Sequence, residues 1–227
     1  MFFFTRIRWP RFTQNDYEKL IEQRLGSSNV VKGDTYQYLA LLELQKQASK
    51  IAASIYQLRG TLNDSNEIKQ LDTKLQSVIL EAARGRNFVF KMTDSIEITN
   101  LWNGVKAKLK AENTFYCGGK AWSVLFMGMN SILFAAGVAG VILFASVIAT
   151  GPLGGALLGL GMAVLSALVV GITAYSLYAD YRNITDTPTK EIEEGIKFLT
   201  IYAQYPEILK ENELAKAASN HISLSTI

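Results

Sequence analysis

Charge is missing from a long stretch of this sequence: residues 121–179 contain no Asp, Glu, Lys, Arg or His over 59 consecutive positions. A soluble domain of ordinary composition is not expected to contain such a stretch, because about a quarter of its residues are charged. A transmembrane helix needs about 20 apolar residues, since it rises about 1.5 Å per residue through a hydrocarbon core of about 30 Å. The stretch is therefore too long for one span and predicts two.

Cysteine and histidine are also scarce. The one cysteine, Cys117, excludes a disulfide within the chain, and the one histidine, His221, has no second histidine or carboxylate cluster beside it for metal or base chemistry. No phosphate-binding glycine loop and no nucleophile motif is found. We therefore expect neither an enzyme nor a cofactor or metal site, and the lack of ionisable residues in the spans disfavours a transporter.

A turn divides the uncharged stretch. It lies in the sequence TGPLGG at residues 150–155, with turn residues Gly151, Pro152 and Gly154. Proline cannot donate to a helical ladder and glycine accepts turn dihedrals, so the spans are predicted at 122–149 and 156–178. They contain 13 and 10 Leu, Ile, Val or Phe residues. At roughly 0.3 to 0.6 kcal/mol each, these side chains favour the insertion of both spans.

Positive charge gathers at one end of this hairpin. The membrane-proximal basic residues are Lys106, Lys108, Lys110 and Lys120, whereas the turn is neutral. Because loops rich in Lys and Arg remain in the cytosol, both termini are predicted to be cytosolic, in a multi-pass protein with two spans.

The region before the hairpin has a helical periodicity. From Leu41 the apolar positions step by three and four to Leu62, and a second run extends from Ile68 to Ala82. This spacing predicts an antiparallel pair of helices over 34–60 and 64–84, with a C-cap at Gly60. The first run provides a candidate partner face, which either packs in the bundle or offers a groove to another protein; its residues are Leu41, Leu44, Ile51, Ile55 and Leu58.

Further helices are predicted over about 86–110, from Pro188 to near Pro206, and over 207–218. The expected fold is all-α, a membrane-spanning helical hairpin joined to a cytosolic helical bundle. Its parts are an aromatic and basic segment at 1–12, the bundle or coiled-coil-like domain at 13–120, the hairpin at 121–179 and a C-terminal helical segment and tail at 180–227.

Small residues recur every fourth position in the second span, and they are expected to provide hairpin packing: Gly155, Gly159, Ala163, Ala167 and Gly171. In the first span Gly128, Ser131, Ala135 and Ala139 are expected to face them. Small residues allow helix backbones to approach closely in lipid. The stripe either closes the hairpin on itself or joins two copies of the chain into a homo-oligomer.

The first twelve residues interleave aromatic side chains with three arginines, Arg6, Arg8 and Arg11. Aromatic rings settle at the headgroup level of a bilayer, so this segment predicts a lipid contact; the alternative is a segment that is disordered or docked on the core. Nucleic acid is not an expected partner, because three arginines allow few phosphate contacts. Cys117, near the bilayer, is either a palmitoylation site or an ordinary thiol.

A hydrophobic hairpin flanked by heptad-bearing helices resembles the inclusion-membrane proteins of chlamydiae and coiled-coil effectors of Legionella-type bacteria. The tail sequence YPEILKENEL, with Glu207, Glu211 and Glu213, looks like the acidic cluster of many substrates of the Dot/Icm secretion system. This resemblance implies secretion and residence in a host-cell or vacuolar membrane with both termini in the host cytosol. It implies no catalytic residue.

Two functions remain as hypotheses. In the first, the hairpin anchors a cytosolic scaffold or tether that binds an unidentified protein partner, with the lipid bilayer as the second partner. In the second, the hairpin is the inserting element of a helical pore-forming or membrane-remodelling protein, either hidden until triggered or acting as a wedge.

Overall fold

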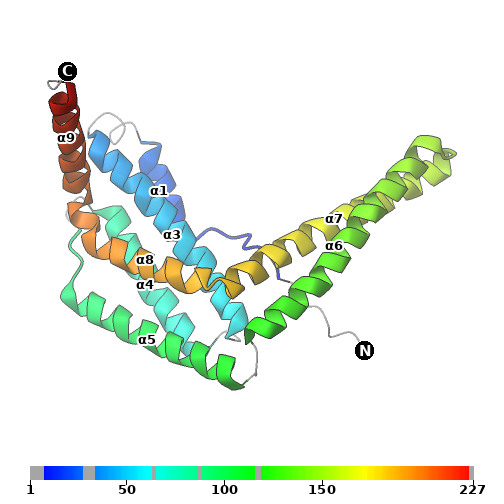
Figure 1. Ribbon diagram of the computed structural model, residues 1–227, viewed down its shortest axis with the longest axis horizontal. Helices are drawn as coiled ribbons and strands as arrows, with labels where there is room; N and C mark the ends of the chain where they lie inside the picture. Colours follow the sequence, from blue (N-terminus) through cyan, green and yellow to red (C-terminus); the bar gives the residue numbers. More distant parts are fainter. Residues whose placement is uncertain (1–7, 28–33, 63–64, 86–87, 116–118, 225–227) are drawn as a thin grey trace. The chain divides into compact units, whose positions relative to one another are not determined.

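The computed structural model describes residues 8–27, 34–62, 65–85, 88–115 and 119–224, with side chains described outside 112–123, 150 and 216–224. All regular secondary structure in these residues is helical, as predicted (Figure 1). The chain forms two compact units. We call residues 1–12 and 110–187 the hairpin unit, and residues 13–109 and 188–227 the bundle unit.

The bundle unit is built from helices whose starts are fixed by local capping. Asn15 precedes the first helix and donates its backbone N–H to Glu18 at 2.7 Å, while the Asp34 carboxylate accepts the backbone N–H of Tyr36 at 2.9 Å. The helices are α1 (Asp16–Leu25), α3 (Thr35–Thr61), α4 (Asn66–Arg84), α5 (Met92–Phe115, as far as residue 109), α8 (Thr187–Ile201, from residue 188), the 3-10 turn η1 (Tyr202–Gln204) and α9 (Tyr205–Leu224).

These bounds agree with the predicted pair of helices, with one correction. Gly60 was expected to be a C-cap, but α3 continues through it to Thr61, and Leu62 is the capping residue. The backbone N–H of Leu62 bonds to the carbonyl of Leu58 at 2.8 Å, which ends the helix without a glycine. The third helix begins at Met92 rather than near residue 86.

The core of the bundle unit lies between α3, α4 and the helices that cover them. The apolar runs of α3 and α4 are almost fully buried, together with Tyr17 and Ile21 of α1 and Leu199 of α8. Helices α8 and α3 approach closely, since a Cβ added at Gly195 would lie 2.5 Å from Ile51. Burial of this apolar surface is the main contribution to the stability of the unit.

The hairpin unit contains two long antiparallel helices. Helix α6 (Gly119–Thr150) and helix α7 (Leu153–Ile184) pack against each other along their length, and Gly151 and Pro152 connect them (Figure 1). Both helices extend beyond the predicted spans. At about 1.5 Å per residue, each 32-residue helix is about 48 Å long, which exceeds the thickness of a bilayer's hydrocarbon core.

Candidate functional site

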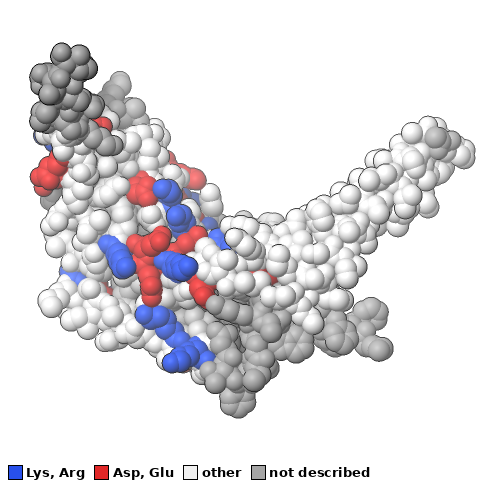
Figure 2. Space-filling model, viewed as in Figure 1, with Lys and Arg blue, Asp and Glu red and all other residues white. Residues whose placement is uncertain are grey.

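The outer surface of the hairpin is apolar and exposed. Residues 124–149 and 153–184 are long and apolar enough to span a membrane, with mean hydropathies of 2.6 and 2.3, and only 6% of the most apolar stretch of each is buried. Its visible face carries no charge in Figure 2, whereas charged side chains gather over the bundle helices. Among the described residues of the two helices, eleven large aliphatic side chains are more than half exposed: Val124, Ile132, Ile142, Leu143, Leu153, Leu157, Leu158, Leu160, Val164, Leu165 and Leu168.

The two helices meet along a seam that uses glycine where they come closest. A Cβ added at Gly140 would lie 2.6 Å from Ser166 Oγ, and one at Gly137 would lie 2.9 Å from Val170. On α7, a Cβ at Gly159 would lie 3.1 Å from the carbonyl oxygen of Phe144. Close backbone approach of this kind is the usual basis of helix packing in lipid.

The predicted packing stripe follows this seam only in part. Gly159 lies at a close approach and Ala163 is half-buried, but Ala167 is exposed and a Cβ at Gly171 would meet nothing within 4 Å. A Cβ at Gly155 would touch the ring of Pro152 in its own turn. A step of four residues advances about 40° around a helix, so three steps from Gly159 turn the stripe about 120° away from α6.

The partner face expected on α6 is wrong. Gly128, Ser131, Ala135 and Ala139 are all exposed. The seam on α6 instead repeats at alternating steps of three and four, as in a coiled coil. Its positions are Phe126, Asn130, Leu133, Gly137, Gly140 and Phe144.

Two of the three predicted turn residues have a structural role in the connection. A Cβ at Gly151 would lie 2.6 Å from the Val147 carbonyl oxygen, so a larger residue would force the turn to shift. Pro152 is the N-cap of α7, and its carbonyl accepts the N–H of Ala156 at 3.0 Å. Gly154, in the first turn of α7, has open space around it.

At the end of the hairpin away from the turn, four polar residues form what we call the base cluster: Arg8, Asn130, Ser176 and Asp180. The Asp180 carboxylate accepts hydrogen bonds from Arg8 Nε and from Asn130 Nδ2, each at 3.2 Å. The Arg8 side chain is 10% exposed and that of Asp180 1%. Paired burial of this kind avoids the large cost of an isolated buried charge.

The base cluster also binds the backbone of the N-terminal segment. The N–H of Arg8 donates to Ser176 Oγ at 3.0 Å, and the Ser176 hydroxyl is 3.4 Å from the Arg8 carbonyl and 3.0 Å from that of Ile172. Asn130 is fully buried, and its Oδ1 has no hydrogen-bond partner among the residues that the structure describes. These polar roles were missed in the sequence, although Thr173, Ser176 and Asp180 share the three- and four-residue spacing of the α7 seam.

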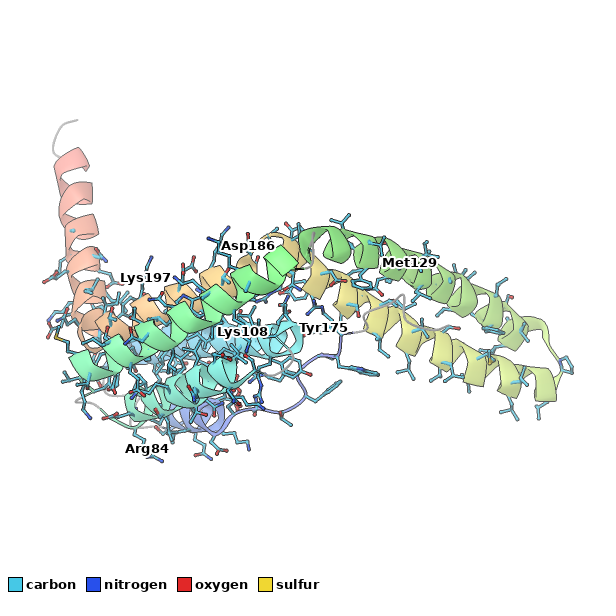
Figure 3. The ribbon with its side chains drawn as sticks, turned by 90° about the horizontal axis from the view of Figure 1, so that it is seen from below. Arg84, Lys108, Met129, Tyr175, Asp186 and Lys197 are labelled. Carbon is cyan, nitrogen blue, oxygen red and sulfur yellow. The ribbon has the colours of Figure 1, made fainter. Side chains whose placement is uncertain are left out.

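Aromatic side chains surround the same end of the hairpin. Tyr175 and Tyr178 have ring centroids 6.4 Å apart, and the Arg182 guanidinium lies over the Tyr178 ring at 5.5 Å. Tyr178 and Tyr181 are more than half exposed. Figure 3 shows Tyr175 on α7 and Met129 on α6 in the half of the hairpin near its base. Tyrosine at this density is typical of the membrane interface.

The predicted basic residues differ in their surroundings. Within the bundle unit, Lys106 pairs with Glu193 at 3.2 Å and Lys108 pairs with Glu67 at 2.9 Å. Lys110 is exposed, and the side chain of Lys120 lies outside the described residues.

These contacts perturb two carboxylates. The hydrogen bond from the Trp102 indole, with a smaller contribution from Lys106, lowers the pKa of Glu193. The hydrogen bond from Lys108 lowers the pKa of Glu67 to about 2.

The candidate partner face is part of the core. Leu41, Leu44, Ile51, Ile55 and Leu58 are each at most 4% exposed, so the structure places them in the bundle rather than in an open groove. Among the described residues, no group of three or more His, Cys, Asp or Glu side chains is placed to hold a metal ion. Cys117, Arg6 and the side chain of His221 lie outside the described residues.

Comparisons of the chain with protein-family models, with curated proteins and with solved structures found no match.

Proposed function

We propose that this chain is an integral membrane protein in which α6 and α7 span a bilayer as a hairpin, and in which the bundle unit serves as a scaffold or tether for a protein partner. The proposal depends chiefly on one observation: the apolar side chains of the hairpin point away from the helix seam and are exposed over its whole length. In water this surface is unfavourable by about 25 cal/mol per Å², and a bilayer is a solvent that accepts it.

The base of the hairpin provides a boundary for the membrane. Asp180 ends the uncharged stretch, and it lies 27 residues, or about 40 Å along α7, from the first residue after the turn. Tyr178 and Tyr181 are exposed at the same level. A hydrocarbon core of about 30 Å therefore fits between the turn and the base cluster, with the tyrosines in the headgroup layer.

The orientation that we propose places both termini in the cytosol. The lysines near the hairpin support it, and their pairing with Glu67 and Glu193 does not weaken the argument, because carboxylates contribute little to the orientation of spans. The turn at Gly151 and Pro152 is neutral, so its transfer across the bilayer has little electrostatic cost.

The bundle unit acts through binding rather than catalysis in this proposal. Its apolar seam is occupied by its own core, so a partner would bind the outer surface of the helices. Secretion and delivery to a host membrane are a separate proposal, supported by the hairpin pattern and by the exposed carboxylates of Glu207, Glu211 and Glu213.

A pore-forming or remodelling protein is the rival. A soluble form that hides the hairpin requires other helices to cover the apolar faces of both α6 and α7, each 32 residues long. The rival predicts a protein that purifies without detergent and inserts only after a trigger.

The first test is carbonate extraction combined with protease protection, on full-length protein with a tag at each terminus. Resistance to carbonate and cleavage of both tags from the cytosolic side support the proposal. A protein that carbonate releases contradicts it, and a tag that is protected contradicts the orientation.

Charged substitutions make the test specific to the hairpin. Ile142→Arg combined with Leu165→Arg places two charges on exposed positions near mid-span, each at a cost of about 2.5 to 3.5 kcal/mol, which should release the protein into the carbonate fraction. Val89→Arg combined with Leu214→Arg is the matched control, since both side chains are comparably exposed in the bundle unit. Equal extraction of the two variants would contradict insertion of the hairpin.

A further inference from the structure

Residues 8–12 have no regular secondary structure, and Arg8 binds them to the base of the hairpin. Arg8 is held at two points: its backbone N–H donates to Ser176 Oγ, and its guanidinium donates to the Asp180 carboxylate. Phe12 follows four residues later, and four extended residues reach at most about 14 Å. The side chains between Arg8 and Phe12 are therefore confined to the neighbourhood of the base cluster.

The aromatic side chains of this segment do not pack into a core. Trp9 is 54% exposed and Phe12 is 80% exposed. A segment that only docked on protein would bury such rings, because each carries a large apolar area. The end of the apolar hairpin that carries the exposed Tyr178 and Tyr181 therefore also carries the exposed rings of Trp9 and Phe12.

We propose that residues 8–12 are an interfacial membrane anchor, fixed to the hairpin by the Arg8 and Asp180 pair, whose Trp9 and Phe12 side chains enter the headgroup layer of the bilayer. The inference rests on the proposed function, since it requires the hairpin to span. The occupant is lipid because the anchor belongs to the same compact unit as the uncharged surface of α6 and α7, and because Asp180, which binds the anchor, marks the level at which that surface ends.

Burial of the charge pair explains how an arginine can lie at this level. With its guanidinium on Asp180, Arg8 is 10% exposed and presents little charge to lipid, while its backbone is bonded to Ser176. The segment thereby gains a fixed depth relative to α7. Trp9 and Phe12 then provide a third attachment to the bilayer, beside the two spans.

The test measures the depth of Trp9 by quenching of its fluorescence in vesicles. Full-length protein with Trp102→Phe and Trp122→Phe keeps Trp9 alone, and it is placed in phosphatidylcholine brominated either near the carbonyl end or near the methyl end of the acyl chain. We expect stronger quenching by the shallow bromines. A reference protein with Trp9→Phe and Leu165→Trp in the same background should be quenched more strongly by the deep bromines.

The same quenching assay tests whether the ion pair of Arg8 and Asp180 holds the anchor in place. Asp180→Asn and Arg8→Gln should each reduce quenching of Trp9 and shift its emission to longer wavelength, while the Leu165→Trp reference in the same variant is unchanged. The charge exchange Arg8→Asp with Asp180→Arg should restore part of the quenching. If the Trp102→Phe background does not fold, the difference between the native chain and its Trp9→Phe variant gives the same measurement.

The outcomes separate the two proposals. Quenching of the Leu165→Trp reference by deep bromines, with Trp9 quenched by aqueous iodide and not by lipid, would overturn the anchor and leave the spanning hairpin intact. Quenching of neither probe by lipid would overturn both. Quenching of Trp9 that is unchanged in Asp180→Asn would overturn the role of the ion pair.

Discussion

Asp180, near the end of α7, accepts a hydrogen bond from the guanidinium of Arg8, which lies 172 residues earlier in the chain. Both side chains are almost completely buried. Breaking a buried pair by removing one partner leaves an uncompensated charge, at a typical cost of about 3 to 5 kcal/mol, whereas replacing both is much less costly.

Arg8→Gln and Asp180→Asn are therefore each expected to destabilise the hairpin unit by about 3 kcal/mol or more, and the double variant by less than the sum of the two. Unfolding in mixed micelles with increasing dodecyl sulfate, followed by circular dichroism, measures the change. Lys46→Gln is the control, because its pair with Glu43 is exposed and contributes little. If the loss of stability in the double variant equals the sum of the losses in the single variants, the two residues are not coupled.

The glycine seam makes a second prediction. Gly140→Leu and Gly159→Leu should loosen the hairpin by about 1 to 3 kcal/mol, because the added side chains collide with Ser166 and with the Phe144 carbonyl. Gly171→Leu is the matched control on α7, where nothing lies within 4 Å. Hydrogen exchange of the hairpin amides should be faster in the first two variants only. Faster exchange in Gly171→Leu would mean that this face is covered, as by a second copy of the chain.

The helices were predictable because each carries a local signal. The three- and four-residue spacing of Leu41 to Leu62 marks the buried face of α3, and the uncharged stretch marks α6 and α7. The small-residue stripe predicted the packing face of the hairpin only in part, for a geometric reason. Positions four residues apart rotate steadily around a helix, whereas the observed seam alternates steps of three and four residues. The spacing of Asn130, Gly137 and Gly140 fits the alternating steps of three and four residues, and it could have predicted the seam of α6.

The base cluster could not be predicted in the same way. The pairing of Arg8 with Asp180 depends on the path of the N-terminal segment, and no periodicity in residues 8–12 specifies where this irregular segment docks. Asn130 is one amide in an apolar helix, and its contact with Asp180 follows only from the register of the antiparallel pair. Long-range polar contacts of this type require the tertiary structure.

Substitution by alanine at two glycines of the bundle unit should change the stability of the unit in opposite directions. A Cβ at Gly195 would lie 2.5 Å from two atoms of the buried Ile51, so Gly195→Ala should destabilise the unit by about 1 to 3 kcal/mol. Gly104 lies within α5 with open space around it, so Gly104→Ala should stabilise by about 0.5 to 1 kcal/mol through helix propensity. Thermal unfolding of both variants in detergent checks the signs. Equal effects would contradict the close crossing of α3 and α8.

The exposed pair of Glu67 and Lys108 predicts that the stability of the folded protein depends on pH, over a range set by the pKa of Glu67. The hydrogen bond from Lys108 lowers the pKa of Glu67 from 4.5 to about 2, so the carboxylate remains charged in the folded protein at a pH where it would be protonated in the unfolded chain. A carboxylate whose pKa is lower in the folded protein than in the unfolded chain stabilises the folded protein. This contribution is present above pH 4.5 and is lost as the pH falls toward 2. Because the group is exposed, solvent and salt screen this contribution and keep it small.

Carbon NMR of the glutamate carboxyls, with the signal assigned by Glu67→Gln, measures this pKa directly. We expect Lys108→Gln to move it upward toward 4.5, and high salt to weaken the coulombic part of the shift while the hydrogen bond at 2.9 Å keeps the pKa below its usual range. Lys91→Gln is the control, since its partner is Glu81. A Glu67 pKa that stays near 2 in Lys108→Gln would mean that Ser65 and the backbone N–H, rather than the lysine, hold the carboxylate in its charged form.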